Sequence, residues 1–274
     1  MYFTKMHGAG NDFVIIDNRR GEIPAEALPE LAKRLCARHT GVGADGLMVI
    51  TESSRADYAM LFYNSDGTVG EMCGNGARCI CRYGYENALA GDVQRVETTS
   101  GIVTGKRIDE KRYRVRLNDP SVIDVHRAVR AGGAEYDCAY IELGSPGLPH
   151  AVVRLDGWEA MSKDELRELG RRLRWAKEFP KGANVTFVKL TAENTVKAIT
   201  FERGVEDFTL ACGTGCGASA AALTVLGLVS GKNVTVTMSG GEITVDLDEA
   251  DGRVENIYIT GPTALVFKGE LFEA

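Results

Sequence analysis

The sequence predicts an α/β (α+β) protein of two related halves, each a sheet wrapped around one apolar helix. Glycine is frequent and proline sparse, at 32 and 7 of 274 residues, which favours many short strands joined by tight turns. The pattern Cys-Gly-x-Gly occurs at residues 73–76 and 212–215, each time after a strand-like run and before a helix-like run. The run after the second copy lacks a polar face, as is typical of a buried helix.

In the first half, runs rich in β-branched and aromatic residues predict strands at 12–17, 47–51, 58–63, 95–99 and 112–117. Residues 28–38 predict a helix with Leu31 and Leu35 on its apolar face. A second helix is expected after Gly76. The pattern breaks at the Asn-Asp-Pro of residues 118–120, where we expect a domain boundary.

In the second half, strands are predicted at 139–143, 151–155, 185–190, 196–201, 234–238, 242–247 and 257–260. Ser162 and Glu165 have the spacing of a capping box, which predicts a helix that ends near Trp175. The helix after the second Cys-Gly-x-Gly is expected to end near Gly227 or Gly231. A last strand, 264–272, returns to the first half. The predicted domains are therefore 1–118 with 263–274, and 119–262.

The composition is that of an ordinary soluble protein, with 44% hydrophobic and 26% charged residues. No segment is long and apolar enough to span a membrane, and the first residues lack a signal-peptide pattern. A net charge of −6 argues against a general nucleic-acid surface. Seven cysteines without a secretory signal favour reduced thiols in the cytoplasm. The cysteine spacings and the scattered histidines indicate no metal site and no metal cofactor.

The repeated Cys-Gly-x-Gly pattern places a thiol at the start of a helix. The positive end of the helix dipole favours thiolate there, and the glycines allow backbone N–H groups to turn toward one anion. Two such thiols from related halves predict a pair that faces one substrate from opposite sides, an arrangement suited to proton exchange at a stereocentre. The other cysteines, 36, 79, 81, 138 and 216, are expected to be small core residues.

Five blocks carry a resemblance to a known family: Gly-Ala-Gly-Asn-Asp-Phe at 8–13, Asn-Ser-Asp-Gly-Thr at 64–68, Met-Cys-Gly-Asn-Gly-Ala-Arg-Cys at 72–79, Glu-Arg-Gly at 202–204 and Leu-Ala-Cys-Gly-Thr-Gly at 210–215. With these blocks the chain resembles the diaminopimelate epimerases, cofactor-independent enzymes of lysine and peptidoglycan biosynthesis. The resemblance extends from the first residues to the last predicted strand.

The resemblance implies two pseudo-symmetric domains, each a strongly curved, mostly antiparallel sheet around a central helix. It implies an isomerase that interconverts LL- and meso-diaminopimelate without pyridoxal phosphate, metal or nucleotide, and that forms a homodimer. The domains of such an enzyme are expected to close on the substrate and to exclude water.

The resemblance also assigns roles to residues of this sequence. Cys73 and Cys212 correspond to the thiolate and thiol that act on opposite faces of Cα, and His150 and Glu202 correspond to their partners. The implied substrate-binding residues are Asn11, Asn64, Gly74, Asn75, Asn184, Glu202, Arg203, Gly213 and Thr214. Backbone amides of the two cysteine turns would hold the α-carboxylate, while the asparagines, Glu202 and Arg203 would bind the far end of the substrate.

Two departures keep other functions open. Many family members read Gly-Asn-Pro-His where this chain has Leu148, and residues 205–209 are one residue longer than usual and include Phe208. These changes suggest a racemase on the same scaffold with another substrate, such as histidine. A non-catalytic amino-acid-binding protein, or an isomerase of a substrate other than an amino acid, are further alternatives. The glycine-rich segment 41–46 lacks the Lys-Ser/Thr end of a phosphate loop and is interpreted as a turn beside the site.

Overall fold

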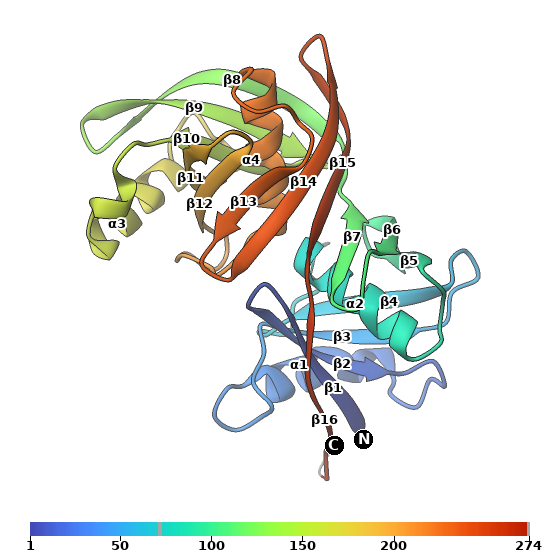
Figure 1. Cartoon of the computed structure of the whole chain (residues 1–274). Helices are drawn as coiled ribbons and strands as arrows, with labels where there is room; N and C mark the ends of the chain where they lie inside the picture. The colour runs from blue at the N-terminus through green and yellow to red at the C-terminus, as the bar shows by residue number, and fades with distance from the viewer. Residues whose placement is uncertain (71–72, 273–274) are drawn as a thin grey trace. The chain divides into compact units, whose positions relative to one another are not determined.

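The computed structural model describes residues 1–70 and 73–272. Residues 71–72 and 273–274 lie outside this range, and with them Met72 of the first cysteine block and the end of the predicted first domain. The chain forms two compact units (Figure 1). Unit 1 is Met1–Val115 with Gly261–Ala274, and unit 2 is Arg116–Thr260.

Unit 1 is built around one sheet with the strand order β16-β1-β2-β3-β4-β5-β6-β7. Its strands are β1 (Tyr2–Gly8), β2 (Asn11–Asp17), β3 (Gly46–Thr51), β4 (Tyr58–Asn64), β5 (Val93–Thr98), β6 (Gly101–Arg107), β7 (Arg112–Arg116) and β16 (Ala264–Glu270). Its helices are the 3₁₀ turn η1 (Ala25–Ala27), α1 (Leu28–Cys36) and α2 (Gly74–Glu86). The predicted last strand therefore does return to the first half of the chain, where β16 pairs with β1.

Unit 2 has the strand order β15-β14-β13-β12-β11-β10-β9-β8. Its strands are β8 (Pro120–Ala131), β9 (Ala134–Leu143), β10 (Leu148–Arg154), β11 (Asn184–Ala192), β12 (Thr195–Phe201), β13 (Val234–Met238), β14 (Gly241–Ala250) and β15 (Arg253–Pro262). Its helices are the 3₁₀ turn η2 (Trp158–Ala160), α3 (Lys163–Arg174) and α4 (Gly213–Val225).

The two units repeat one arrangement of strand pairs. From β16 to β7, the pairs β2–β3 and β4–β5 are parallel and the others are antiparallel. From β8 to β15, the pairs β10–β11 and β12–β13 are parallel and the others are antiparallel. Helices α2 and α4 occupy equivalent positions, each between the two strands of the second parallel pair. The predicted mostly antiparallel sheets of two pseudo-symmetric halves are confirmed.

One helix lies against several strands in each unit. α4 packs against β9, β10, β11 and β14, and almost all of its residues are buried (Figure 1). α2 packs against β1, β2 and β6. The Ala- and Gly-rich sequence of α4 has no polar face. Such a sequence suits a helix that is buried on all sides.

The two amphipathic helices are α1 and α3. α1 buries Leu28, Leu31 and Leu35 against β2, β3 and β4. α3 begins with the predicted capping box: the Glu165 N–H donates to Ser162 Oγ at 3.2 Å, and the Ser162 N–H donates to Glu165 Oε2 at 2.9 Å.

Strand β8 is the clearest difference from the sequence prediction. The Asn-Asp-Pro break was expected to interrupt the pattern, but β8 begins at Pro120 itself. Most of its side chains are exposed or half-buried, and its register with β9 shifts twice, so no apolar run marks it. A proline can begin such a strand because β8 is an edge strand of the sheet. Strands β1 and β6 were also not predicted.

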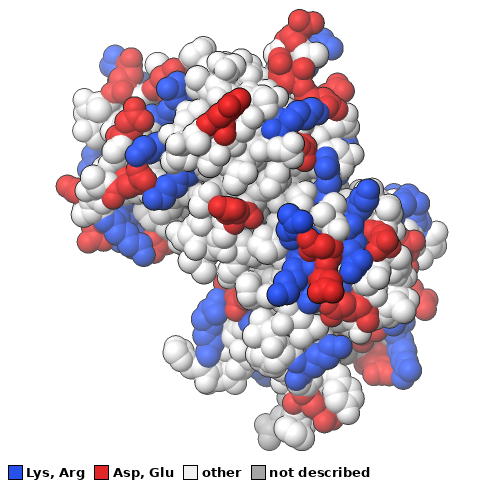
Figure 2. Space-filling view, in the orientation of Figure 1, with Lys and Arg blue, Asp and Glu red and all other residues white. Residues whose placement is uncertain are grey.

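The charged side chains are mixed in sign. Figure 2 shows Lys and Arg interspersed with Asp and Glu over the face drawn, as expected for a solvated surface. Over the described residues, the helices are all too short or too polar to cross a lipid bilayer.

Candidate active site

Cys73 and Cys212 occupy the same position in the two units. Each is the N-cap of its helix, Cys73 of α2 and Cys212 of α4, and each has an extended backbone, with φ of −108° and −120°. The first-turn N–H groups of a helix lack acceptors within the helix and carry its positive partial charge. Each cysteine is therefore placed beside a group of amides that can receive a carboxylate.

The third residue after each cysteine is a glycine that packs closely on its neighbours. Gly76 and Gly215 lie inside helices and do not have left-handed backbones. A Cβ on Gly76 would approach Met48 Cε to 2.0 Å, and one on Gly215 would lie 3.2 Å from Cys212 Sγ. The glycines let the start of each helix pack closely on its surroundings.

In unit 1 the first cysteine turn meets the N-terminal hairpin. Cys73 Sγ donates to Asn11 Oδ1 at 3.3 Å, and Asn75 Nδ2 donates to the same oxygen at 3.4 Å. The buried guanidinium of Arg78 donates to Asn75 Oδ1 at 2.8 Å and to the Gly74 carbonyl at 3.3 Å. Four predicted site residues, Asn11, Cys73, Gly74 and Asn75, are thus brought together.

Asn64, at the end of β4, is held in another way. Its Nδ2 donates to Thr68 Oγ1 at 2.9 Å. The next residue, Ser65, donates its N–H to the Asp45 carbonyl at 3.2 Å, and Asp45 Oδ2 accepts from Asn11 Nδ2 at 2.7 Å. The glycine-rich segment 41–46 therefore does lie beside Asn11, and Asn64 pairs with Gly46 of that segment where β4 meets β3.

In unit 2 the second cysteine is buried, with 6% of its surface exposed. Cys212 Sγ accepts the Gly215 N–H at 3.4 Å and lies 3.6 Å from Thr214 Oγ1. Burial raises the pKa of the Cys212 thiol well above its usual value, and the negative charge of Glu202 raises it further. The hydrogen bonds from Thr214 and Gly215 act in the opposite direction but are smaller. The helix N-terminus favours the thiolate, but at Cys212 burial outweighs this effect and favours the thiol.

Glu202 follows β12 and begins a tight turn before Cys212. Thr209 Oγ1 donates to Glu202 Oε1 at 2.6 Å, and the Glu202 N–H donates to the Asp207 carbonyl at 3.1 Å. Phe208 points from this turn into the core, where its ring packs edge-on against Phe201 at a centroid distance of 5.8 Å. The longer 205–209 segment thus contributes an aromatic side chain to the core of unit 2.

His150 is completely buried on β10, opposite Asn184 on β11. Asn184 Oδ1 accepts the Arg203 N–H at 2.8 Å, and its Nδ2 donates to the Pro149 carbonyl at 3.4 Å. Burial, and then the charge of Arg203, lower the pKa of His150 to about 3. Both ring nitrogens are without a hydrogen-bond partner among the described residues. A neutral, buried imidazole with both nitrogens unpaired is a recognised mark of a functional position.

His150 should make the stability of unit 2 depend on pH. Its folded pKa of about 3 lies below the usual 6.5, so the unfolded chain binds a proton first as the pH falls. The free energy of unfolding therefore decreases as the pH falls below 6.5, by about 2 kcal/mol at pH 5. Urea unfolding at pH 7.5 and pH 5 should show this loss in the wild type and not in His150→Leu. The exposed His39 supplies the control: His39→Gln should behave as the wild type does.

Several residues around the two cysteines were not predicted as part of the site. Thr209 lies in segment 205–209 and Asp45 in segment 41–46. A single threonine or aspartate in a loop matches no sequence motif that would predict its role. Lys5 and Arg38 carry no sequence signal at all, because only the fold brings them to Asp12.

Comparison with known proteins gives one consistent result. The sequence model of the diaminopimelate epimerase family matches residues 3–123 and 144–266. The chain is 39% identical to the diaminopimelate epimerase of Aquifex aeolicus, over 100% of this chain and 98% of the relative. It is 38% identical to that of Archaeoglobus fulgidus, over 98% and 95% of the two chains.

Among solved structures, the chain resembles a phenazine biosynthesis protein of the PhzF family from Bacillus anthracis, with a TM-score of 0.74 and 16% identity over 100% and 99% of the two chains. It also resembles a probable proline racemase from Agrobacterium radiobacter, with a TM-score of 0.72 and 18% identity over 98% and 92%. These structures share the fold. The sequence relatives, together with the paired cysteine turns, show that the chain belongs to the diaminopimelate epimerase family.

Proposed function

We propose that this protein interconverts LL- and meso-diaminopimelate, with Cys73 and Cys212 as the two groups that exchange the Cα proton. The observation that carries the proposal is the equivalent placement of these cysteines at the N-caps of α2 and α4, in a chain whose full-length relatives are named diaminopimelate epimerases. Binding alone needs no pair of thiols at equivalent helix starts.

In the proposed reaction, one cysteine as thiolate takes the proton from Cα, and the electron pair of the broken C–H bond stays on the substrate. The other cysteine, as thiol, delivers its proton to the opposite face and is left as thiolate. The positive ends of α2 and α4, through the amides of Gly74, Asn75, Gly213 and Thr214, hold the α-carboxylate and stabilise the negative charge that develops.

Glu202 supplies what Cys212 needs to act as a base. Cys212 is a thiol because burial and the Glu202 charge disfavour a second negative charge beside the carboxylate. Transfer of the thiol proton to Glu202 creates the thiolate without changing the total charge of the pair. In the reverse direction the same pair presents a thiol ready to donate. The ring nitrogens of His150, which have no partner among the described residues, support its assignment as the partner of the other cysteine, which it would contact as a neutral imidazole.

Further parts of the proposal follow from family membership. Asn11, Asn64, Asn184 and Arg203 bind the far amine and carboxylate of diaminopimelate, and the two units correspond to the two epimerase domains. The protein acts in the cytoplasm as a homodimer, in lysine and peptidoglycan biosynthesis, without a cofactor.

Proton exchange in D₂O tests the proposal directly. The protein is incubated with LL-diaminopimelate and, in parallel, with L-histidine and L-proline. Proton NMR follows loss of the Cα signal, and chiral chromatography follows stereochemistry. Exchange and conversion of diaminopimelate alone are expected. Exchange of another amino acid alone would replace the proposal by a racemase, and binding without exchange would replace it by a binding protein.

Phe208 bears on the histidine alternative. Histidine was considered as a substrate because Phe208 could line the pocket with an aromatic ring. In the structure the Phe208 ring packs on Phe201 and Phe187 in the core of unit 2. Leu148, the other departure, begins β10 two residues before His150 and is half-buried. Diaminopimelate therefore remains the proposed substrate. The exchange experiment tests whether an enzyme with Leu148 at this position accepts it.

Thr209 should affect activity through Glu202. Its hydroxyl hydrogen bond at 2.6 Å fixes the carboxylate and favours its ionised form. Thr209→Val keeps the shape and removes this donor, so we expect kcat to fall by about tenfold, while Thr209→Ser should keep most of the activity. Steady-state kinetics measures both. Equal activity of the Val and Ser variants would contradict this role.

A further inference from the structure

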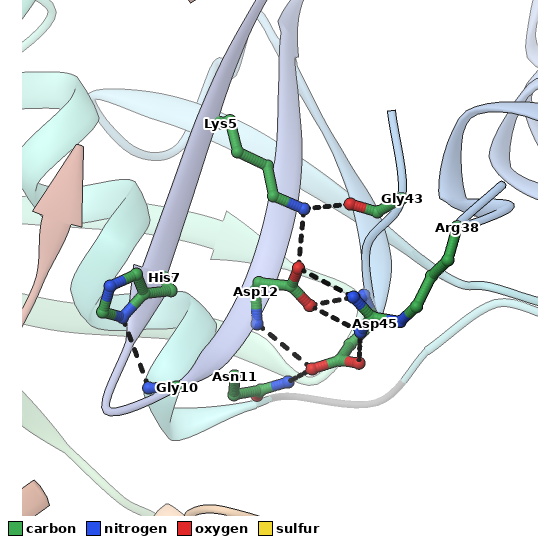
Figure 3. A network of polar contacts seen from close by, with 8 residues as sticks. All are labelled: Lys5, His7, Gly10, Asn11, Asp12, Arg38, Gly43 and Asp45. Atoms are coloured by element: carbon green, nitrogen blue, oxygen red, sulfur yellow. Dashed lines mark hydrogen bonds and ion pairs between the residues drawn. The ribbon is translucent and has the colours of Figure 1, made fainter. Parts of the chain in front are cut away.

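A polar network connects the glycine-rich segment 41–46 to Asn11 (Figure 3), and Asn11 in turn contacts Cys73. Asp45 stands at its centre: Oδ1 accepts from Arg38 Nη2 at 2.7 Å, and Oδ2 accepts both Asn11 Nδ2 at 2.7 Å and the Asp12 N–H at 3.1 Å. The acceptor of the Asn11 amide in this network is therefore a carboxylate oxygen. A carboxylate cannot donate, so only the NH₂ end of the Asn11 amide can point toward it.

The orientation of the Asn11 amide decides what Cys73 meets. With Nδ2 bound to Asp45, Oδ1 faces the sulfur, which donates to it at 3.3 Å. An oxygen acceptor stabilises the thiol and opposes the thiolate, whereas the NH₂ end would do the reverse. Asn75 Nδ2, at 3.4 Å from the same oxygen, supports this orientation with a longer contact.

The position of Asp45 is itself fixed by the end of α1. The N–H groups of Gly41, Gly43 and Ala44 donate to the Ala37, Leu35 and Cys36 carbonyls. A Cβ on Gly41 would come within 2.2 Å of the Arg34 carbonyl oxygen, so the loop closes on the helix only with glycine there. Lys5 bonds both Asp12 and the Gly43 carbonyl, which ties the loop to β1.

We propose that Asp45 is a positioning residue that locks the Asn11 amide with its oxygen toward Cys73 and so keeps Cys73 protonated in the free protein. This deepens the proposed function, in which one cysteine must start as the acid, and only the kinetic measurement below rests on that function. The carboxylate acts through Asn11, across one side chain.

The test follows the reactivity of the Cys73 thiol, without substrate. Iodoacetamide labelling is measured from pH 6 to 10, with mass spectrometry to locate the labelled cysteine. Asp45→Ala frees the Asn11 amide to turn its NH₂ end to the sulfur. The midpoint of Cys73 labelling should then fall by about 0.5 to 1 pH unit. Asp45→Asn, of equal size, should shift it in the same direction, since its oxygen stays on Arg38 and its own NH₂ group turns to Asn11.

Three controls separate this effect from others. Asp109→Ala removes a comparable carboxylate, which accepts from the Lys111 and Arg112 N–H groups at 2.9 and 2.8 Å, and should leave the midpoint unchanged. Cys79, fully buried on α2 with a pKa that burial raises to about 12, is labelled only if the variant unfolds. Labelling is repeated in 0.5 M KCl, which screens the loss of one exposed charge but not a reoriented amide.

Among the described residues, several charged and titratable groups belong to the Asn11–Asp45 network or to the start of α2. They are Lys5 and His7 on β1, Asp12 on β2, Arg38 and Asp45 beside α1, and Arg78 and Cys79 on α2. The Asp45 variants replace only one of these charged groups. A midpoint that stays at the wild-type value in both folded variants, or a shift that disappears in 0.5 M KCl, would overturn the proposal.

Kinetics adds a second readout. If Asn11 binds diaminopimelate, the Asp45 variants should raise KM more than they lower kcat. A protein that exchanges no Cα proton would refute the proposed function, yet the labelling experiment would still decide whether Asp45 orients Asn11.

Discussion

Replacement of Cys73 or Cys212 by Ala is expected to stop the conversion of LL- to meso-diaminopimelate. Inversion needs one group on each face of Cα, and either variant keeps only one. The rate of conversion should fall by about 10³-fold or more, since a positioned acid or base commonly contributes this much. Chiral chromatography of the products measures the loss.

The same variants distinguish two bases from one. The remaining thiol can still remove and return a proton on its own face, so we expect slow incorporation of deuterium from D₂O with retention of configuration. Cys216→Ala and Cys79→Ala, at buried positions of the same two helices, are the matched controls and should stay active. Full conversion by Cys73→Ala or Cys212→Ala would refute the two-cysteine mechanism.

Glu202→Gln is expected to have the next largest effect. The variant cannot accept the Cys212 proton, so at pH 7.5 kcat should fall by about 10²-fold. Removal of the Glu202 charge also takes away the second largest of the causes that raise the pKa of Cys212, although burial, the largest cause, stays. The thiolate then forms by simple titration, and the activity of the variant should rise steadily from pH 7 to 9.5.

Glu206→Gln is the control for Glu202→Gln. Glu206 lies in the same turn, is exposed, and pairs with Arg174 at 3.2 Å. Its replacement should change kcat by less than about twofold, because its carboxylate accepts from the buried Arg174 and from the Gly204 N–H and not from Thr209. If Glu202→Gln and Glu206→Gln gave the same kcat at pH 7.5, Glu202 would have no part in proton transfer.

Several elements of the fold can be predicted from short stretches of sequence. Residues 234–238 were predicted as a strand and form β13 with the same bounds, because Val234, Val236 and Met238 are buried alternately with half-exposed threonines. The capping box at Ser162 was likewise predictable from four residues. β8 was not, because an edge strand with few buried side chains depends on its pairing with β9 rather than on its own apolar pattern.

The chemistry of the site was predictable in part. The N-cap positions of Cys73 and Cys212 follow from the glycine pattern, and both are found in the structure. The state of Cys212 does not follow, because burial outweighs the helix dipole and depends on residues distant in sequence. The hydrogen bond between Asp45 and Asn11 was not predictable either, because the two residues are 34 positions apart and no sequence pattern links them.

The position of β16 at the end of the chain has a consequence for biosynthesis. In unit 2 the edge strand β8 precedes the rest of its sheet, whereas its counterpart in unit 1 is β16, which is translated after the whole of unit 2. Unit 2 can therefore fold while unit 1 still lacks a strand. Until β16 leaves the ribosome, one side of β1 offers unpaired backbone N–H and C=O groups to other nascent chains, so this edge is where premature association would begin.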